Sequence, residues 1–144
     1  MNFIKLLTCS NNNDFTVVSY NKNFSICSLL FKNKRFLITG GTGSFGSATI
    51  KKLINQKVKE IVIFSRDEKK QHDLRLQYKG NQKINFVVGD IRDYQSIKNA
   101  LSNIDYVFHA AALKQVPTAE IFPLESLKTN TLGAENLIIA AKNC

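Results

Sequence analysis

The feature that most constrains this chain is a glycine-rich stretch, TGGTGSFG, at residues 39–46. It follows an apolar run, Phe36-Leu37-Ile38, and it precedes a segment in which apolar residues recur at helical spacing. In a strand–turn–helix unit of this kind, glycines let main-chain N–H groups approach a phosphate, and the last glycine lets the helix pack closely on its strand. The sequence therefore predicts a phosphate-binding turn, formed by the backbone of Gly40, Thr42, Gly43, Ser44, Phe45 and Gly46.

The rest of residues 34–144 alternates between short apolar runs and segments with helical patterning. The apolar runs predict strands at 35–39, 60–64, 84–88 and 105–108, and the second of them, EIVIF, is typical of a strand buried on both faces. Helices are predicted at about 44–55, 65–80, 94–101 and 123–142, with a loop containing Pro117 before the last of them. This alternation predicts an α/β fold, a partial Rossmann-type parallel sheet of about four strands with crossover helices, in the order 3-2-1-4.

Residues 1–33 are predicted to be an N-terminal extension of this unit. They are rich in Asn, Ser and Lys, and residues 14–20 suggest a strand that could form a hairpin with residues 24–30. An extension without regular structure is the alternative. In a sheet of this type, a fifth strand would normally follow the last helix and pair with the fourth strand. Since the sequence given ends after that helix, the fourth strand is predicted to have an unpaired apolar edge. We therefore expect poor solubility or dimerisation.

The chain has 144 residues and a net charge of +9, which raises the question of nucleic-acid binding. Basic and acidic residues are interspersed, and no basic helix or aromatic-interleaved patch accompanies them, so we expect no nucleic-acid partner. The apolar stretches are too short to span a membrane, and we expect no membrane segment. The three cysteines are far apart and neither histidine has a metal-ligand spacing, which argues against a metal site and fits a cytoplasmic protein.

The residues that follow the second predicted strand bear on the choice of cofactor. An acidic residue about 20 positions past the last glycine would bind a ribose hydroxyl and favour NAD. At that distance the chain has Ser65 and Arg66, whose hydroxyl and guanidinium suit a 2′-phosphate, with further positive charge from Lys69 and Lys70. NADP is therefore predicted, while Asp67 keeps NAD as an alternative. In a purely structural interpretation, the same Ser-x-x-Glu pattern is a helix capping box and the arginine is solvated.

The ends of the third and fourth predicted strands supply further candidates. Asp90 could accept a hydrogen bond from an adenine amino group, and Ile91 could pack on the adenine ring. Small residues after the fourth strand would let the middle of a dinucleotide lie against the backbone; they are Ala110, Ala111 and Ala112. Lys114 is a candidate contact for a nucleotide sugar. Each also has an ordinary structural explanation, as a turn residue, a packed small residue or a solvated lysine.

With these residues together, the sequence resembles the extended short-chain dehydrogenase/reductase superfamily, whose turn is Thr-Gly-x-x-Gly-x-x-Gly. More specifically, it resembles the UDP-N-acetylglucosamine 4,6-dehydratases, C5-inverting type, of the polysaccharide-biosynthesis group. The resemblance covers residues 34–144 and is carried by LITGGTGSFG at 37–46, IVIFSRDEKKQHDLR at 61–75, VGDIRDYQSI at 88–97 and YVFHAAALKQVPTAEIFPLESLKTNTLGAENLI at 106–138.

The resemblance implies cofactor contacts at the residues named above, a substrate contact at Lys114, and, at Asn130, an asparagine that lies under the active site and orders its proton network. In such enzymes the cofactor takes a hydride from C4 of the sugar, water leaves across C5–C6, and the hydride returns to C6. The resemblance also implies that the catalytic segments lie beyond Cys144, so no catalytic residue is assigned. Tyr94 and Lys98 match the Tyr-x-x-x-Lys catalytic dyad of the superfamily, but they follow the third strand, on the adenine side, and are rejected.

We therefore expect the N-terminal, cofactor-binding part of an NADP-dependent nucleotide-sugar 4,6-dehydratase for surface polysaccharides, inactive alone. A UDP-sugar 4-epimerase of the same superfamily is one alternative, and a non-catalytic dinucleotide-binding module is another. The expected partners are a nucleotide-sugar substrate in the full-length enzymes and either a second copy, as a homo-oligomer, or a complementing C-terminal fragment.

Overall fold

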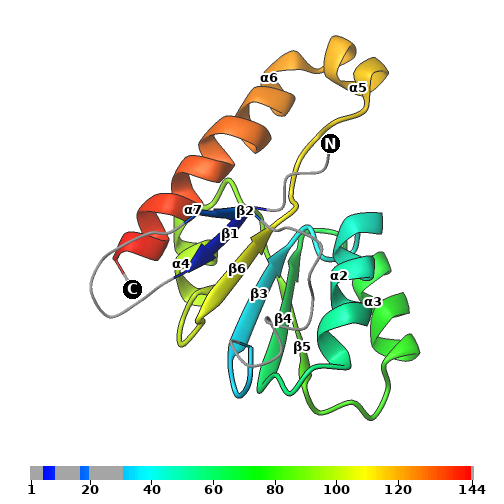
Figure 1. Ribbon diagram of the computed structural model, residues 1–144. Helices are drawn as coiled ribbons and strands as arrows, with labels where there is room; N and C mark the ends of the chain where they lie inside the picture. Colours follow the sequence, from blue (N-terminus) through cyan, green and yellow to red (C-terminus); the bar gives the residue numbers. More distant parts are fainter. Residues whose placement is uncertain (1–4, 9–16, 20–30, 144) are drawn as a thin grey trace.

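The computed structural model describes residues 5–8, 17–19 and 31–143. Within them, one six-stranded sheet has the order β2-β1-β6-β3-β4-β5 (Figure 1). The neighbours β5-β4-β3-β6 are parallel, and an antiparallel pair extends the sheet past β6. The strands are β1 (Lys5–Thr8), β2 (Val17–Ser19), β3 (Arg35–Thr39), β4 (Glu60–Ser65), β5 (Ile84–Val88) and β6 (Tyr106–His109).

The four parallel strands form where the sequence predicts them and in the predicted order. β3 and β5 have the predicted bounds, whereas β4 continues to Ser65 and β6 is displaced by one residue. β3 and β4 are buried along almost their whole length, because β-branched and aromatic side chains cover both of their faces. Ile38 of β3 lies opposite Ile63 of β4 and Phe108 of β6, which aligns the carboxyl ends of the strands at one edge. The predicted Rossmann-type α/β fold is confirmed.

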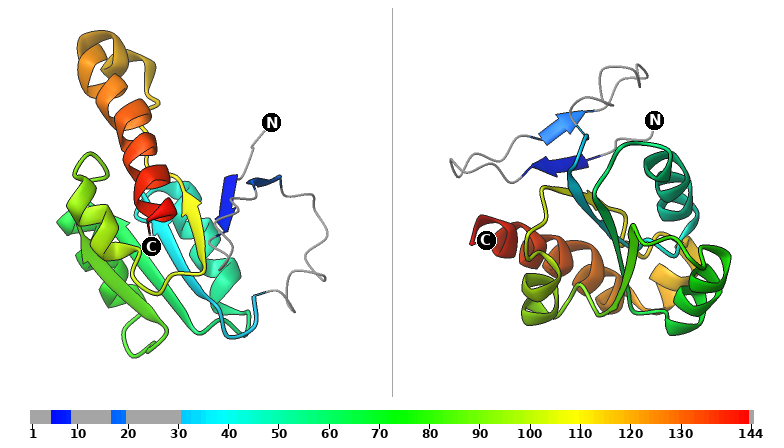
Figure 2. Two further views of the ribbon diagram at one scale, coloured as in Figure 1. Left: turned by 90° about the vertical axis from the view of Figure 1, so that its left-hand side faces the viewer. Right: turned by 90° about the horizontal axis from the view of Figure 1, so that it is seen from below.

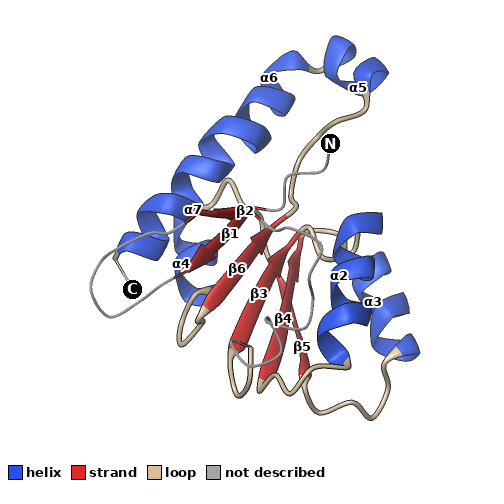
Figure 3. Ribbon diagram, viewed as in Figure 1, coloured by secondary structure: helices blue, strands red, loops and turns tan. Residues whose placement is uncertain are grey.

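Helices cover both faces of the parallel strands (Figure 3). α2 (Ser44–Ile54) and α3 (Glu68–Gln77) lie on one face, and α4 (Tyr94–Ala100) and α7 (Gly133–Lys142) lie on the other (Figure 1). Neighbouring residues of a strand point to opposite faces, so Ile38 packs in the core beneath α2 and Leu37 packs in the core beneath α4 and α7. This arrangement leaves the carboxyl ends of the strands open between the two helical layers.

The segment between β6 and α7 differs from the prediction. The expected loop around Pro117 contains a short helix, α5 (Val116–Ile121), in which the proline occupies the first turn, where no N–H is needed. The expected helix from Pro123 onward is present, but it consists of α6 (Pro123–Leu127), a π-helical turn η1 (Lys128–Leu132) and α7. α5 and α6 extend beyond the sheet (Figure 2). Within residues 5–8, 17–19 and 31–143, no helix has the length and hydropathy needed to cross a membrane.

The edge of β6 is paired, which corrects the expectation that it would be free. β1 runs antiparallel to β6 and places Leu6 opposite Phe108, while β2 pairs with the outer side of β1. The backbone groups of β6 therefore have partners from the N-terminal part of the chain. The strand expected within residues 14–20 is confirmed at Val17–Ser19, but its partner is β1. The segment proposed as its partner, residues 24–30, lies outside the described residues.

Candidate functional site

A cavity of about 480 Å³ opens where the carboxyl ends of the parallel strands meet. Its walls come from the glycine turn after β3 and from the segments that follow β4, β5 and β6. Among the residues predicted from the sequence, those that line it are Gly40, Thr42, Gly43, Ser44, Phe45, Gly46, Ser65, Arg66, Asp67, Lys70, Asp90, Ile91, Ala110, Ala111, Ala112 and Lys114. Lys69 and Asn130 are not part of its lining. The residues that sequence reasoning missed are Phe64, Gly89, Leu113, Gln115, Thr118 and Thr129.

Two glycines allow the turn a geometry that other residues would disturb. Gly40 has a φ of +65°, and a Cβ at this position would lie 2.7 Å from the backbone nitrogen of Ala111 and 2.8 Å from the carbonyl oxygen of Ala110. Gly46, in the first turn of α2, would place a Cβ 2.6 Å from the carbonyl carbon of Gly41. The turn therefore packs directly on the backbone after β6, and α2 packs directly on the turn.

The N-terminus of α2 faces the cavity without a side-chain cap. Gly43, the N-cap residue, has no side chain that could accept a hydrogen bond from the first turn, and this turn contains no acidic residue. The first N–H groups of a helix lack intrahelical partners and carry the positive end of the helix dipole. Because Ser44, Phe45 and Gly46 line the cavity, this end of the helix is suited to an anionic group such as a phosphate.

The segment after β4 is organised differently from the predicted capping box. The hydroxyl of Ser65 forms a hydrogen bond with the hydroxyl of Thr42, with 2.9 Å between the oxygens, and accepts one from the backbone N–H of Asp67 at 3.2 Å. Asp67 is the N-cap of α3, and its carboxylate accepts from the backbone N–H of Lys70 at 2.9 Å. The hydrogen bond from Lys70 lowers the pKa of Asp67. The alternative interpretation of Ser65 as the cap of a capping box therefore does not hold, and its hydroxyl links β4 to the glycine turn.

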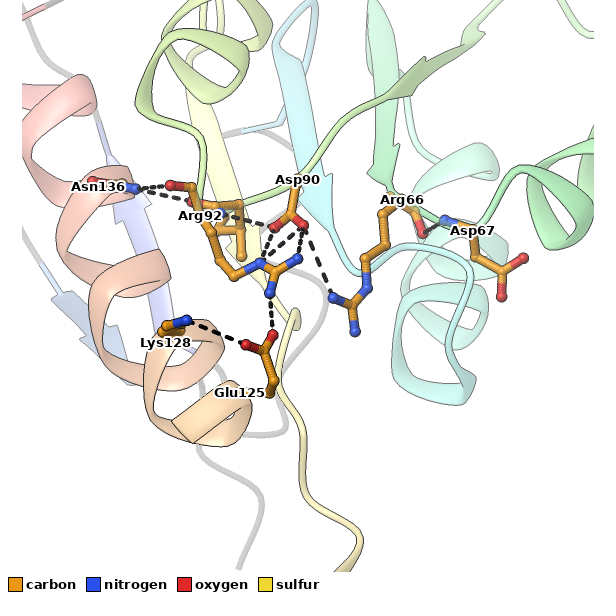
Figure 4. A network of polar contacts seen from close by, with 9 residues as sticks. Arg66, Asp67, Asp90, Arg92, Glu125, Lys128 and Asn136 are labelled. Atoms are coloured by element: carbon orange, nitrogen blue, oxygen red, sulfur yellow. Dashed lines mark hydrogen bonds and ion pairs between the residues drawn. The ribbon is translucent and has the colours of Figure 1, made fainter. Parts of the chain in front are cut away.

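Asp90, after β5, lies between two arginines (Figure 4). Arg92 donates to its carboxylate from the backbone N–H at 3.0 Å, from Nε at 2.9 and 3.0 Å, and from Nη2 at 2.5 Å. Arg66 approaches from the other side, with Nη1 3.9 Å from Asp90 Oδ2. The hydrogen bonds from the Arg92 side chain hold the pKa of Asp90 below its ordinary value. Asp90 is therefore an ionised group at neutral pH, in direct contact with a cation.

Arg92 was not singled out from the sequence. Its guanidinium also donates to the carboxylate of Glu125 on α6, and Glu125 accepts a hydrogen bond from Lys128 at 3.3 Å (Figure 4). The pKa of Glu125 is lowered, chiefly by Lys128 and also by Arg92. The Asp-x-Arg spacing at 90–92 could have indicated the contact between Arg92 and Asp90. The contact between Arg92 and Glu125 joins residues far apart in the chain, so no local pattern indicates it.

Asn130 positions the segment after β6, although it does not line the cavity. Its side chain accepts from the backbone N–H of Leu113 at 2.8 Å and donates to the carbonyl oxygen of Leu113 at 2.9 Å. Leu113 and the neighbouring Lys114 do line the cavity. The asparagine predicted to lie under the active site therefore fixes the backbone of one cavity wall.

The rejected catalytic dyad lies away from the cavity. Neither Tyr94 nor Lys98 is part of the lining; Tyr94 packs partly against the core beneath α4, and Lys98 is exposed. In the part of the chain that the structure describes, no group of three or more His, Cys, Asp or Glu side chains could hold a metal ion. The residues that line the cavity supply backbone N–H groups, hydroxyls and charged side chains.

Known proteins resemble this chain over the same region. A UDP-glucose 4-epimerase of Rickettsia prowazekii is 54% identical over 118 residues, a match that covers 79% of this chain and 34% of the relative. Among solved structures, Pen from Bacillus thuringiensis is 41% identical with a TM-score of 0.74, covering 77% of this chain and 34% of that one. The UDP-Glc/GlcNAc 4-epimerase from Campylobacter jejuni is 25% identical with a TM-score of 0.64, covering 76% and 34%. The chain thus spans about a third of the length of the curated relatives it matches.

One protein family matches almost the whole parallel sheet and all of the cavity. Its members are described as polysaccharide biosynthesis proteins, and the match covers residues 36–144. The matched region begins in β3 and contains every cavity-lining residue. These comparisons support the extended short-chain dehydrogenase/reductase superfamily, and the 4,6-dehydratase subfamily stays a prediction. The chain belongs to the polysaccharide biosynthesis protein family.

Proposed function

We propose that the cavity binds a nicotinamide dinucleotide and that residues 34–144 form the cofactor-binding part of a nucleotide-sugar enzyme. The observation that carries this proposal is the meeting of the uncapped N-terminus of α2 with a turn whose Gly40 has no room for a side chain. Such a site suits a pyrophosphate, because backbone N–H groups can approach it closely. The segments after β4, β5 and β6 extend the cavity to either side of this point.

NADP is the cofactor that we propose in preference to NAD. Arg66 lines the cavity with its side chain half exposed, and Lys70 lines it nearby, so positive charge is available for a 2′-phosphate. Asp67, which would serve a ribose hydroxyl in an NAD site, is already the N-cap of α3 and pairs with Lys70 at 3.1 Å. We assign Asp90 and Ile91 to the adenine end, and the alanines at 110–112 to the middle of the dinucleotide.

The proposed reaction begins at C4 of a nucleotide sugar. A bound nicotinamide dinucleotide would supply a hydride acceptor for oxidation at this carbon. Lys114 would contact the nucleotide sugar, and Asn130 would fix the wall that carries Lys114 through its two hydrogen bonds to Leu113. The names of the curated relatives favour a UDP-sugar 4-epimerase, while the stretch at 106–138 resembles UDP-N-acetylglucosamine 4,6-dehydratases. Both activities share the oxidation at C4.

Binding of the dinucleotide is tested by fluorescence titration of the purified chain with NADPH and with NADH. We expect NADPH to bind more tightly, and Arg66→Ala to weaken NADPH selectively. Lys83→Ala, which removes an exposed positive charge outside the cavity, is the matched control. If neither nucleotide binds, the proposed function is wrong; if Arg66→Ala weakens both equally, the assignment of the 2′-phosphate is wrong.

The activity is tested by incubating the chain with NADP⁺ and UDP-N-acetylglucosamine and analysing the sugar nucleotide by mass spectrometry and NMR. Loss of water with a 4-keto group indicates the dehydratase, and inversion at C4 without a change in mass indicates the epimerase. Binding of the dinucleotide without any change in the sugar indicates a module that does no chemistry alone, which is the outcome that we expect.

A further inference from the structure

The two arginines that approach Asp90 are held in different ways. Arg92 makes hydrogen bonds to the carboxylate at 2.5–3.0 Å through its backbone N–H, Nε and Nη2. Arg66 lies at 3.9 Å, which is beyond hydrogen-bonding distance, and half of its side chain is exposed. Arg92 is thus bound to Asp90, whereas Arg66 is only attracted by it.

Arg92 is also fixed on its other side. Its Nη1 donates to Glu125 on α6, and the side chain of Asn136 on α7 donates to the carbonyl oxygens of Ile91 and Arg92 at 3.3 and 2.8 Å. Arg66 lines the cavity and Arg92 does not, and the two guanidinium groups approach Asp90 from different sides (Figure 4). The two arginines therefore occupy different positions: Arg66 lies in the cavity wall, and Arg92 contacts Asp90 without lining the cavity.

We propose that Arg92 is a positioning residue for cofactor choice: by binding and neutralising Asp90, it keeps Arg66 available to the 2′-phosphate of NADP. The inference rests on the proposed function. A 2′-phosphate carries about 1.5 to 2 negative charges at neutral pH, so an uncompensated carboxylate nearby would repel it. The same carboxylate would compete with the phosphate for Arg66. Arg92 reduces both effects without itself lining the cavity, and the remaining 3.9 Å approach of Arg66 to Asp90 leaves a residual competition that removal of the carboxylate would relieve.

The charge pattern makes the proposal specific to Asp90. Among the described residues, Asp90 is the acid that pairs with Arg66, while Asp67, next to Arg66 in the chain, is paired with Lys70. When Arg92 is lost, Arg66 is the cation that remains beside Asp90. Arg66 should then shift from the cavity toward the carboxylate, and affinity for NADPH should fall more than affinity for NADH, which lacks the phosphate.

The test compares dissociation constants for NADPH and NADH in the full chain carrying Arg92→Gln, Asp90→Asn or both substitutions. Lys98→Gln is the control, because it removes one exposed positive charge that does not line the cavity. We expect Arg92→Gln to lower the preference for NADPH about two- to fivefold, the range expected for unmasking one partly exposed charge near another. Asp90→Asn should raise the preference up to about fivefold, and the double variant should behave as Asp90→Asn does.

Each outcome bears on the proposal. An unchanged preference in a folded Arg92→Gln variant overturns it, and so does a double variant whose preference stays as low as that of Arg92→Gln, because Arg92 would then act on the phosphate directly. If Arg92→Gln does not fold, Asp90→Asn decides the matter, and an unchanged or lower NADPH preference in that variant refutes the inference. A wild-type chain that binds neither nucleotide refutes the proposed function itself.

Discussion

Replacing Gly40 by alanine tests the geometry on which the candidate site depends. Gly40 has a φ of +65°, and the new Cβ would lie 2.7 Å from the backbone nitrogen of Ala111 and 2.8 Å from the carbonyl carbon and oxygen of Ala110. Gly80 is a matched control, because its φ is +86° but no atom lies within 4 Å of the position of a Cβ. The two substitutions share the backbone strain and differ in the steric clash.

The expected loss of stability follows from these two contributions. A non-glycine residue in the left-handed region costs about 1–2 kcal/mol. Forcing extra atoms into a closely packed site costs a further 1–3 kcal/mol or so, because the backbone after β6 must shift. We therefore expect Gly40→Ala to lower the free energy of unfolding by about 2–5 kcal/mol and Gly80→Ala by about 1–2 kcal/mol.

Urea unfolding followed by circular dichroism measures both values, and equal slopes of the free energy against urea concentration make them comparable. Titration with NADPH adds a second measurement, in which Gly40→Ala should bind less tightly and Gly80→Ala should bind as the wild type does. If both variants lose the same free energy of unfolding, the close approach between the glycine turn and the segment after β6 does not exist, and the explanation given for Gly40 is refuted.

Three further predictions concern other parts of the molecule. Asn130→Ala should cost only about 1 kcal/mol, because its two hydrogen bonds are exposed, but the Leu113 amide should lose protection in hydrogen exchange, and unchanged protection would contradict the positioning role. Removing residues 1–20 should promote association in light scattering, because β1 no longer covers β6; a monomer at all concentrations would argue against this. The pKa of Asp90 is lowered, so its contribution to stability is present above the ordinary value of about 3.9 and is lost only as the pH falls through the folded value. NMR titration of the Asp90 carboxyl carbon should show this, and Arg92→Gln should return the pKa toward the ordinary value.

The parallel sheet was predictable because its signal is local. β3 and β4 are short runs of β-branched and aromatic residues, and burial on both faces requires such composition. The positions of the cavity-lining segments follow from the same pattern, because the carboxyl ends of parallel strands meet at one edge of the sheet. The glycine turn, Arg66 and Asp90 could therefore be assigned to one site from the sequence alone, and all of them line the cavity.

The features that escaped prediction depend on contacts between distant segments or lack an apolar signal. α5 has no buried residue, so no hydrophobic pattern marks it as a helix. Ser65 has the composition of a helix cap, but its hydroxyl is engaged with Thr42 in the glycine turn. The pairing of β1 with β6 joins residues about a hundred positions apart, and no local pattern in either strand specifies the other.

The two sides of the cavity are stabilised differently: the sheet side by apolar packing, and the α5–α6 side by a partly exposed ion pair. The glycine turn and the strand ends rest on apolar cores that contain Ile38 and Leu37, both fully buried. α5 and α6 have no buried residue, and Glu125 on α6 contacts the body of the protein through Arg92. Partly exposed ion pairs contribute at most about 1 kcal/mol, so the α5–α6 side should open at far lower free energy than the sheet. Because Arg92 contacts both Asp90 and Glu125, a single side chain links the segment after β5 to α6.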